Sequence, residues 1–282
     1  MFDRQPQVDL WLCPLIELDE TFERISHLKT FLTPDEIAKV DRYRMHADRI
    51  RALYVRAYLR SILSRYCNIE PTQWRFEYGD KGKPTLEINQ LASTGLHFNI
   101  SHSKDHLLIG VFQSPADTVQ LGIDIEHTRE STDIHAITAH YFSSREVEDL
   151  NSLPAVHQRA RFFDLWALKE SYIKATGKGL STSLKSFSFD FSSMKVNHDH
   201  DLVGNDVGST CSNGKFELYT GIDIVFADHT SDKEKEGTNS STYWQSALGR
   251  LNDQYRFAVT LGGVSNDMII SMHEFGNDDL FR

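Results

Sequence analysis

Apolar side chains recur every three or four residues in two stretches of the chain, which is the spacing of one face of an α-helix. The first stretch follows Asp48, a residue type favoured at helix N-caps, and its stripe consists of Ile50, Leu53, Tyr54, Ala57 and Tyr58. The second runs from about His157 to Thr176, is apolar almost all round and precedes Gly177, a common helix terminator. We therefore expect one amphipathic helix and one buried helix.

Other stretches alternate apolar and polar residues, which is the period of a β-strand with one buried face. They are residues 96–100, 107–112, 119–126 and 255–261. The first runs into Ser101-His102-Ser103, and turn residues at 79–84 and 114–117 separate the segments. We expect the first two of these strands to pair. Strands mixed with helices predict an α+β fold.

The length of 282 residues, with 40% hydrophobic content, favours two domains. We place the boundary after residue 115, which gives an N-terminal half of residues 1–115 and a C-terminal half of residues 116–282. From about 192 to 242 the composition shifts towards Ser, Asn, Asp, Gly and Lys, which predicts a long, mobile insertion. Within it, residues 215–227 are apolar enough to form a strand or two.

The charge and the apolar segments exclude several classes of protein. A net charge of −10 argues against nucleic-acid binding, which relies on clustered Lys and Arg. The first twenty residues mix acids with apolar residues, unlike a secretory signal, and no apolar run reaches membrane-spanning length. Cys13, Cys67 and Cys211 lie too far apart for a disulfide framework or a zinc site. We expect a cytoplasmic protein that does not bind membranes.

Two carboxylates share one face of the strand at 119–126. Asp124 and Glu126 are two residues apart, so their Cα atoms lie about 6.6 Å from each other, within reach of one ion. Like charges entering a core are unfavourable without a cation, and oxygen ligands favour magnesium or manganese over zinc. A solvated or salt-bridged pair is the common alternative. Asp223, in a similar string without the second acid, is interpreted as structural or exposed.

The predicted buried helix carries Glu170 and Lys174 on one face. Such a pair is usually a surface ion pair, but rarely on so apolar a helix. If Glu170 joins Asp124 and Glu126, three carboxylates surround one ion, and Lys174 can reach a phosphate beside it. The polar strand end at 97–103 can present hydroxyl, imidazole and amide groups to a phosphate, although a capped loop is the ordinary interpretation of such a turn.

Four strings, in this order, resemble the surfactin-type 4′-phosphopantetheinyl transferases of the holo-carrier-protein synthase superfamily. They are GKP at 82–84, FNISHS at 98–103, GIDIE at 122–126 and LWALKESYIKATGKGL at 165–180. The resemblance covers roughly residues 33–189. It implies two similar α+β halves related by a pseudo-twofold axis, with the active site in the cleft between them, and a monomer.

The resemblance also implies roles for individual residues. Asp124, Glu126 and Glu170 look like the ligands of magnesium, and Lys174 looks like the phosphate-binding lysine. The positions that look like coenzyme A contacts are Lys39, Arg51, Lys83, Pro84, Ser101 and His102. Glu36 departs from the family, because a basic residue often stands there to meet the 3′-phosphate.

The implied reaction is transfer of the 4′-phosphopantetheine group of coenzyme A to a serine of an acyl or peptidyl carrier protein. Glu170 is the favoured general base, with Glu126 or a metal-bound hydroxide as alternatives. Lys174 stabilises or protonates the leaving 3′,5′-adenosine bisphosphate. Because carriers are usually acidic, we expect docking through an apolar patch and local basic residues. The alternatives are another magnesium-dependent phosphotransferase or phosphodiesterase, and a non-catalytic binding module.

Overall fold

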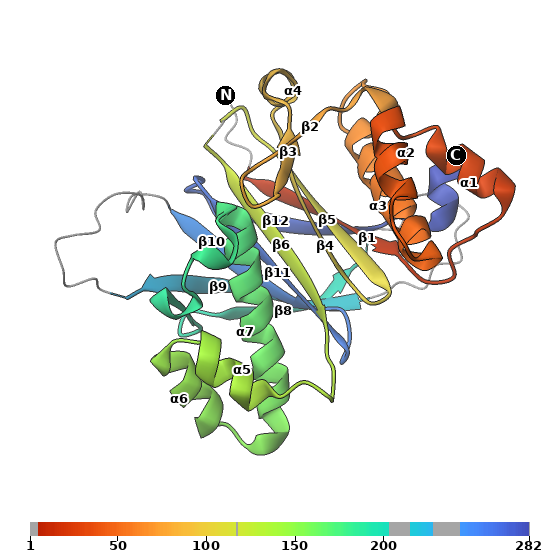
Figure 1. Ribbon diagram of the computed structural model, residues 1–282. Helices are drawn as coiled ribbons and strands as arrows, with labels where there is room; N and C mark the ends of the chain where they lie inside the picture. The colour runs from red at the N-terminus through yellow and green to blue at the C-terminus, as the bar shows by residue number, and fades with distance from the viewer. Residues whose placement is uncertain (1–4, 117, 203–214, 228–242, 282) are drawn as a thin grey trace.

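The structure is a computed structural model that describes residues 5–116, 118–202, 215–227 and 243–281 (Figure 1). These residues form an α+β fold, which confirms the predicted class. The helices are α1 (Phe22–Lys29), α2 (Pro34–Asp41), α3 (His46–Ser64), α4 (Ile88–Thr94), α5 (Ile134–Tyr141), α6 (Ser144–Ser152) and α7 (Ala155–Thr176). The strands are β1 (Gln7–Pro14), β2 (Phe76–Tyr78), β3 (Pro84–Leu86), β4 (Leu96–Ser103), β5 (His106–Gln113), β6 (Gln120–His127), β7 (Phe187–Asp190), β8 (Lys195–Asp201), β9 (Lys215–Phe226), β10 (Trp244–Arg250), β11 (Tyr255–Gly262) and β12 (Ile269–Glu274).

The strands form two main sheets and one short hairpin. The first sheet has the order β12-β1-β5-β4, the second has the order β6-β11-β10-β9-β7 with β8 paired to β9, and β2 pairs with β3. The chain order of the two sheets is similar, because β1 is followed by α1, α2 and α3, and β6 is followed by α5, α6 and α7. Antiparallel strands then return beside β1 or β6 in the same spatial order, β5-β4 or β11-β10. The strand order of the first half thus recurs in the second.

Helices pack against the two sheets, and a shared core joins the sheets to each other. Helices α1, α2 and α3 gather at the first sheet, and α5, α6 and α7 gather at the second (Figure 1). A third apolar cluster includes Leu10 of β1 with Leu121, Ile123 and Ile125 of β6. Because side chains alternate along a strand, Asp124 and its same-face neighbours point to the opposite side, where α7 lies.

The helix predictions hold, with one exception at a boundary. The long buried helix is α7, and Gly177 ends it in the left-handed conformation with φ +67°. The amphipathic helix is α3, but it begins at His46 with Met45 at the N-cap. The predicted N-cap at Asp48 is therefore wrong. Asp48 lies in the first turn of α3, where its negative charge interacts favourably with the positive end of the helix dipole. Among the described helices, none has the length and apolarity needed to cross a membrane.

The predicted pairing of the first two strands is confirmed, and the other two predicted strands form as well. β4 pairs antiparallel with β5 and includes Ser101-His102-Ser103, and β6 pairs antiparallel with β11. Asp223 lies exposed on β9, one of the two interpretations that its sequence allowed. Within the segment expected to be an insertion, β9 forms at the predicted place and buries Phe216, Leu218 and Ile222. The insertion predicted to be mobile, residues 192–242, also includes residues 203–214 and 228–242, which lie outside the described residues.

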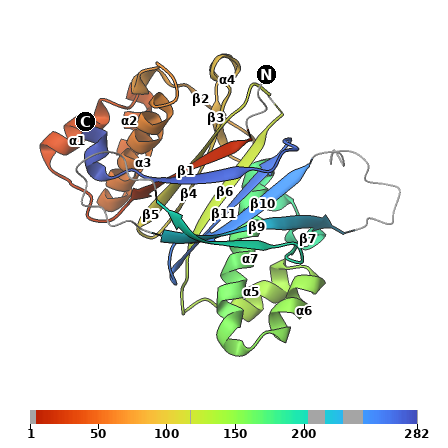
Figure 2. The ribbon, with the colours of Figure 1, turned by 180° about the vertical axis from the view of Figure 1, so that it is seen from behind.

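The end of the chain returns to the first sheet. β12 pairs in parallel with β1 and runs beside it (Figure 2). The short 3-10 helix Asn277–Phe281 follows, and Tyr58 of α3 donates a hydrogen bond to Asn277 Oδ1. The last strand of the chain therefore belongs to the first sheet, and the boundary expected after residue 115 stays a prediction.

Helix α7 lies directly on β6 at Gly122. A Cβ atom added to Gly122 would stand 2.0 Å from Ser171 O and 2.2 Å from Ala175 N, both in the backbone of α7. The Ser171 hydroxyl also hydrogen-bonds with that of Thr260 on β11, at 2.7 Å. Only glycine permits this approach, which brings the polar face of α7 against Asp124.

We predict that Gly122→Ala destabilises the protein by more than the roughly 1–3 kcal/mol of ordinary overpacking, because backbone atoms of α7 must move. Urea unfolding of this variant and of Gly276→Ala measures the effect. Gly276 is the control because its added Cβ meets only Asp279 Oδ2, at 3.6 Å. Equal unfolding midpoints for the two variants would contradict the close approach.

Candidate active site

Three side chains from β4, β6 and α7 meet at one point. Asp124, only 3% exposed, accepts hydrogen bonds at Oδ1 from Ser101 Oγ (2.9 Å) and from Lys174 Nζ (2.6 Å). Lys174 Nζ also donates to Ser101 Oγ at 2.7 Å. Lys174 reaches from α7 to the buried carboxylate of Asp124. The role that the resemblance implies for it, binding a phosphate, stays a prediction. The other oxygen of Asp124, Oδ2, is buried and has no hydrogen-bond partner among the described residues.

The three predicted carboxylates act on one another electrostatically. Burial raises the pKa of Asp124, although Lys174 opposes this effect. Burial, with repulsion from Asp124 and a smaller contribution from Glu170, raises the pKa of Glu126 to about 7. Burial and the charge of Asp124 also raise the pKa of Glu170. The site therefore carries more negative charge than its own cations, chiefly Lys174 and Arg129, can stabilise.

This donor set fits a hard divalent cation. All three acids offer oxygen ligands, one oxygen of Asp124 is orphaned, and their anionic forms are destabilised by burial and mutual repulsion. Within the described part of the chain, however, no three His, Cys, Asp or Glu side chains are already gathered as a metal cluster. Lys174 occupies one oxygen of Asp124, so the ammonium group is the counter-charge in this arrangement.

Alternate side chains of β4 bind the free edge of β6. Asn99 Oδ1 accepts from the backbone N–H of Ile123 at 3.0 Å, and Ser103 Oγ accepts from that of His127 at 3.0 Å. Between them, Ser101 Oγ accepts from the N–H of Ile125 at 3.3 Å. These side chains satisfy donors that a neighbouring strand would otherwise take. We call this set of three contacts the β4–β6 ladder; it joins the two sheets and places Ser101 beside Asp124.

Two of the predicted coenzyme-binding residues, Arg51 and His102, lie next to this point. Partial burial, followed by the charges of Arg51 and Lys174, lowers the pKa of His102. Arg51 Nη1 donates to the carbonyl oxygen of Lys104 at 3.0 Å, which fixes the guanidinium group at the β4–β5 turn. Arg51 comes from the first half and Lys174 from the second, so a positive group of each half acts on His102 and favours its neutral form.

Lys83 and Pro84 stand at the start of β3. The ammonium group of Lys83 donates to Leu121 O at 3.0 Å and to Ala175 O at 2.9 Å, and burial lowers its pKa to about 8. Pro84 is half-buried and begins β3. The side chain of Lys83 is thus engaged with backbone carbonyls, and a role of these two residues in coenzyme binding stays a prediction.

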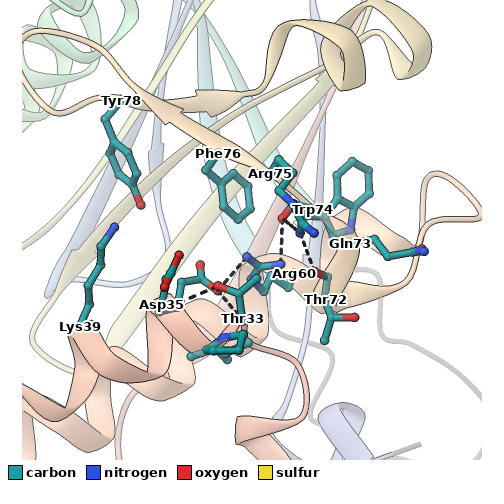
Figure 3. A pocket seen from close by; sticks show the side chains of 13 residues that line it. Thr33, Asp35, Lys39, Arg60, Thr72, Gln73, Trp74, Arg75, Phe76 and Tyr78 are labelled. Atoms are coloured by element: carbon teal, nitrogen blue, oxygen red, sulfur yellow. Dashed lines mark hydrogen bonds and ion pairs between the residues drawn. The ribbon is translucent and has the colours of Figure 1, made fainter.

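Lys39 lies elsewhere, at a cavity of about 600 Å³ between α2 and β2 (Figure 3). Its ammonium group stands 5.5 Å from the centre of the Tyr78 ring. Glu36, which replaces the family's basic residue, pairs with the buried guanidinium of Arg60 at 2.7 Å and caps α2 together with Thr33. None of the other predicted coenzyme contacts lines this cavity. The departure at position 36 therefore has a structural role in this chain.

Sequence reasoning missed the residues that assemble the site without contributing its charge. Gly122 lets α7 approach β6, and Asn99 and Ser103 hold the edge of β6. A signal existed for each: a glycine inside a strand indicates close backbone approach, and polar residues at every second position of an otherwise apolar strand indicate a shared polar face.

Comparison with known proteins agrees with this geometry. A buried aspartate with two half-buried glutamates, all within the electrostatic reach of Lys174, is suited to an enzyme that handles phosphate esters. Residues 120–206 match the 4′-phosphopantetheinyl transferase superfamily, and residues 19–112 match the N-terminal region of 4′-phosphopantetheinyl transferases. The 4′-phosphopantetheinyl transferase HetI of Nostoc sp. is 38% identical over 175 residues, which cover 62% of this chain and 70% of HetI. The transferase Sfp of Bacillus subtilis is 34% identical over 166 residues, 59% of this chain and 69% of Sfp.

The chain therefore belongs to the 4′-phosphopantetheinyl transferase superfamily, as the four strings indicated. It is an enzyme of the Sfp type. The family match favours this activity over another phosphotransferase and over a non-catalytic module.

Ser101 and Ser103 offer a matched pair of variants, because each accepts a hydrogen bond from one backbone N–H of β6. Ser101→Ala and Ser103→Ala should each cost about 1–3 kcal/mol of unfolding free energy, since a buried donor loses its partner. Only Ser101→Ala also removes a contact with Asp124 and Lys174, so it should lose far more transferase activity. Chemical denaturation with steady-state kinetics tests this, and equal activity losses would refute the functional role of Ser101.

Proposed function

We propose that this chain transfers the 4′-phosphopantetheine group of coenzyme A to a serine of an acyl or peptidyl carrier protein, using a magnesium ion held by Asp124, Glu126 and Glu170. The contact of Ser101 and Lys174 with Asp124 is the observation that carries the proposal, because it leaves the second carboxylate oxygen without a hydrogen-bond partner in the described part of the chain. Manganese is the alternative metal, because it accepts the same oxygen ligands.

Coenzyme A lies, in this proposal, in a cleft between two halves, residues 1–115 and 116–282, related by a pseudo-twofold axis. The recurrence of the strand order β1-β5-β4 as β6-β11-β10 supports the axis. Arg51, His102 and Ser101 of the first half meet the adenosine and 3′-phosphate end, with Lys83 and Pro84 as further contacts. Lys39 would have to meet the coenzyme from the separate cavity between α2 and β2. Because both halves belong to one chain, the site is complete in a monomer, and we place the enzyme in the cytoplasm with its coenzyme.

A bound magnesium ion would neutralise charge that builds on the pyrophosphate during transfer. The serine oxygen of the carrier attacks the β-phosphorus, a new phosphoester bond forms, and the bond to the bridging oxygen breaks. Glu170 takes the serine proton, and its raised pKa suits a base that works near neutral pH. Lys174 donates to the phosphate of the departing 3′,5′-adenosine bisphosphate. Glu126 is the second candidate for the base.

The serine of the carrier must approach Glu170 from outside, and both proteins are acidic. We propose that docking depends on an apolar patch and local basic residues of this chain rather than on opposite net charges. The dependence of carrier binding on salt is therefore modest in this proposal.

Mass spectrometry of apo-carrier incubated with the chain, coenzyme A and magnesium tests the activity, since the carrier should gain one phosphopantetheine group. Asp124→Asn should lower the rate by at least about 100-fold, the scale of losing a group that stabilises charge in the transition state. The matched control is Asp223→Asn, because Asp223 stands in a similar string but lies exposed on β9. A full rate for Asp124→Asn would remove the metal assignment.

The pH dependence should reveal competition between protons and the metal. Because burial and neighbouring acids raise the pKa of Glu126 to about 7, this group is protonated below that pH and charged above it. Activity at low magnesium should therefore fall as pH drops through about 7, and more magnesium should move this acid limb lower. For one competing proton the shift is about one pH unit per tenfold magnesium. An acid limb that stays in place at every magnesium concentration contradicts the assignment of Glu126.

A further inference from the structure

Lys83 carries a buried charge that pairs with no carboxylate among the described residues. Its Nζ donates to Leu121 O of β6 and to Ala175 O of α7, at 3.0 and 2.9 Å. Burial without an opposite charge lowers its pKa to about 8, so the charged form is disfavoured here. An apolar side chain of the same length would avoid the free-energy cost of desolvating the charge. We therefore look for what the ammonium group contributes in return.

The two carbonyl acceptors show what the ammonium group holds together. Ala175 O belongs to the last turn of α7, where carbonyls lack the backbone N–H of a following helical turn, and a cation there also complements the helix dipole. Ala175 directly follows Lys174, and Leu121 directly precedes Gly122, the point where α7 rests on β6. Lys83 thus binds both elements at their closest approach, one residue from the group that contacts Asp124.

The turn that carries Lys83 is fitted to the end of α7. Gly79 N donates to Lys83 O at 3.0 Å, and Gly82 holds φ +79°, so the turn is closed by its own backbone. The aliphatic part of Lys83 packs over Gly177, where an added Cβ would lie 3.4 Å from Lys83 Cδ. Lys81 packs in the same way over Gly179, at 3.5 Å. The two left-handed glycines after α7 leave room for the two lysine chains of the first half.

We propose that Lys83 is a positioning residue, whose ammonium group ties the 79–84 turn to β6 and to the end of α7 and so holds Lys174 against Asp124. This inference rests on the proposed function, and it differs from the coenzyme contact that the family resemblance implies for the Lys83 side chain. The two roles predict different kinetics. A lost coenzyme contact raises KM and Kd for coenzyme A, whereas a displaced Lys174 lowers kcat.

Lys83→Met keeps most of the packing over Gly177 and removes the two hydrogen bonds. We expect its kcat to fall about 10- to 100-fold, as for a small misplacement of a reacting group, while KM and the calorimetric Kd for coenzyme A change less than about threefold. Lys83→Arg can donate to both carbonyls and should recover most of the lost kcat. Lys81→Met is the control, because Lys81 is exposed and packs on the neighbouring glycine; its kcat should stay close to the wild-type value.

A double-variant cycle separates positioning from general destabilisation. If Lys83 acts through Lys174, then Lys83→Met should add little to the loss already caused by Lys174→Met. Losses that multiply, or a raised Kd for coenzyme A with unchanged kcat, would overturn the proposal.

Hydrogen exchange provides a measurement that does not depend on turnover. In Lys83→Met, amide exchange should become faster in the last turn of α7, residues 171–177, and stay unchanged in α3. Unchanged exchange at 171–177 also overturns the proposal. If the wild-type chain modifies no carrier, the proposed function fails, while this exchange experiment still decides whether Lys83 ties α7 to β6.

Discussion

The contact between the backbone of α7 and β6 at Gly122 is the constraint on which the active site depends. An α-helix and a strand normally stay apart by the length of their side chains. Here one position without a side chain lets the helix backbone touch the strand, with Ser171 and Ala175 against it. Glu170 and Lys174 directly precede these two residues, so the same contact carries them to the polar face of β6. The distance between Lys174 and Asp124 is a consequence of that approach.

The β4–β6 ladder supplies the second fixed relation, between the two sheets. Two sheet edges can meet through backbone hydrogen bonds, as in a continuous sheet, or through side chains that imitate them. This chain uses Asn99, Ser101 and Ser103 as acceptors for the edge of β6. The Ser101 hydroxyl has two contacts, because it accepts from the edge of β6 and also donates to Asp124 in the site. The first half is thereby bound to the strand that carries the acids.

The site has too little positive charge to balance its three carboxylates when all of them are ionised. Asp124 is buried, and Glu126 and Glu170 are half-buried. Burial raises the pKa of all three carboxyl groups, and the charge of Asp124 raises those of Glu126 and Glu170 further. Lys174 compensates only part of this charge. Burial without sufficient counter-charge costs stability in a folded protein, so such a site is suited to a ligand that brings positive charge with it. The proposed magnesium ion satisfies this requirement, and the phosphates of the coenzyme would be further oxygen ligands for it.

Local patterns in the sequence determined the α+β class, the strand at β6 with two acids on one face, and the buried helix that carries Glu170 and Lys174. These features depend on residue spacing, which a sequence displays directly. The tertiary structure alone decided that Lys174 pairs with Asp124, that the Lys83 ammonium binds backbone carbonyls, and that β12 returns to the first sheet. Such pairings join residues far apart in the chain, and nothing in local spacing specifies which distant partner a side chain meets.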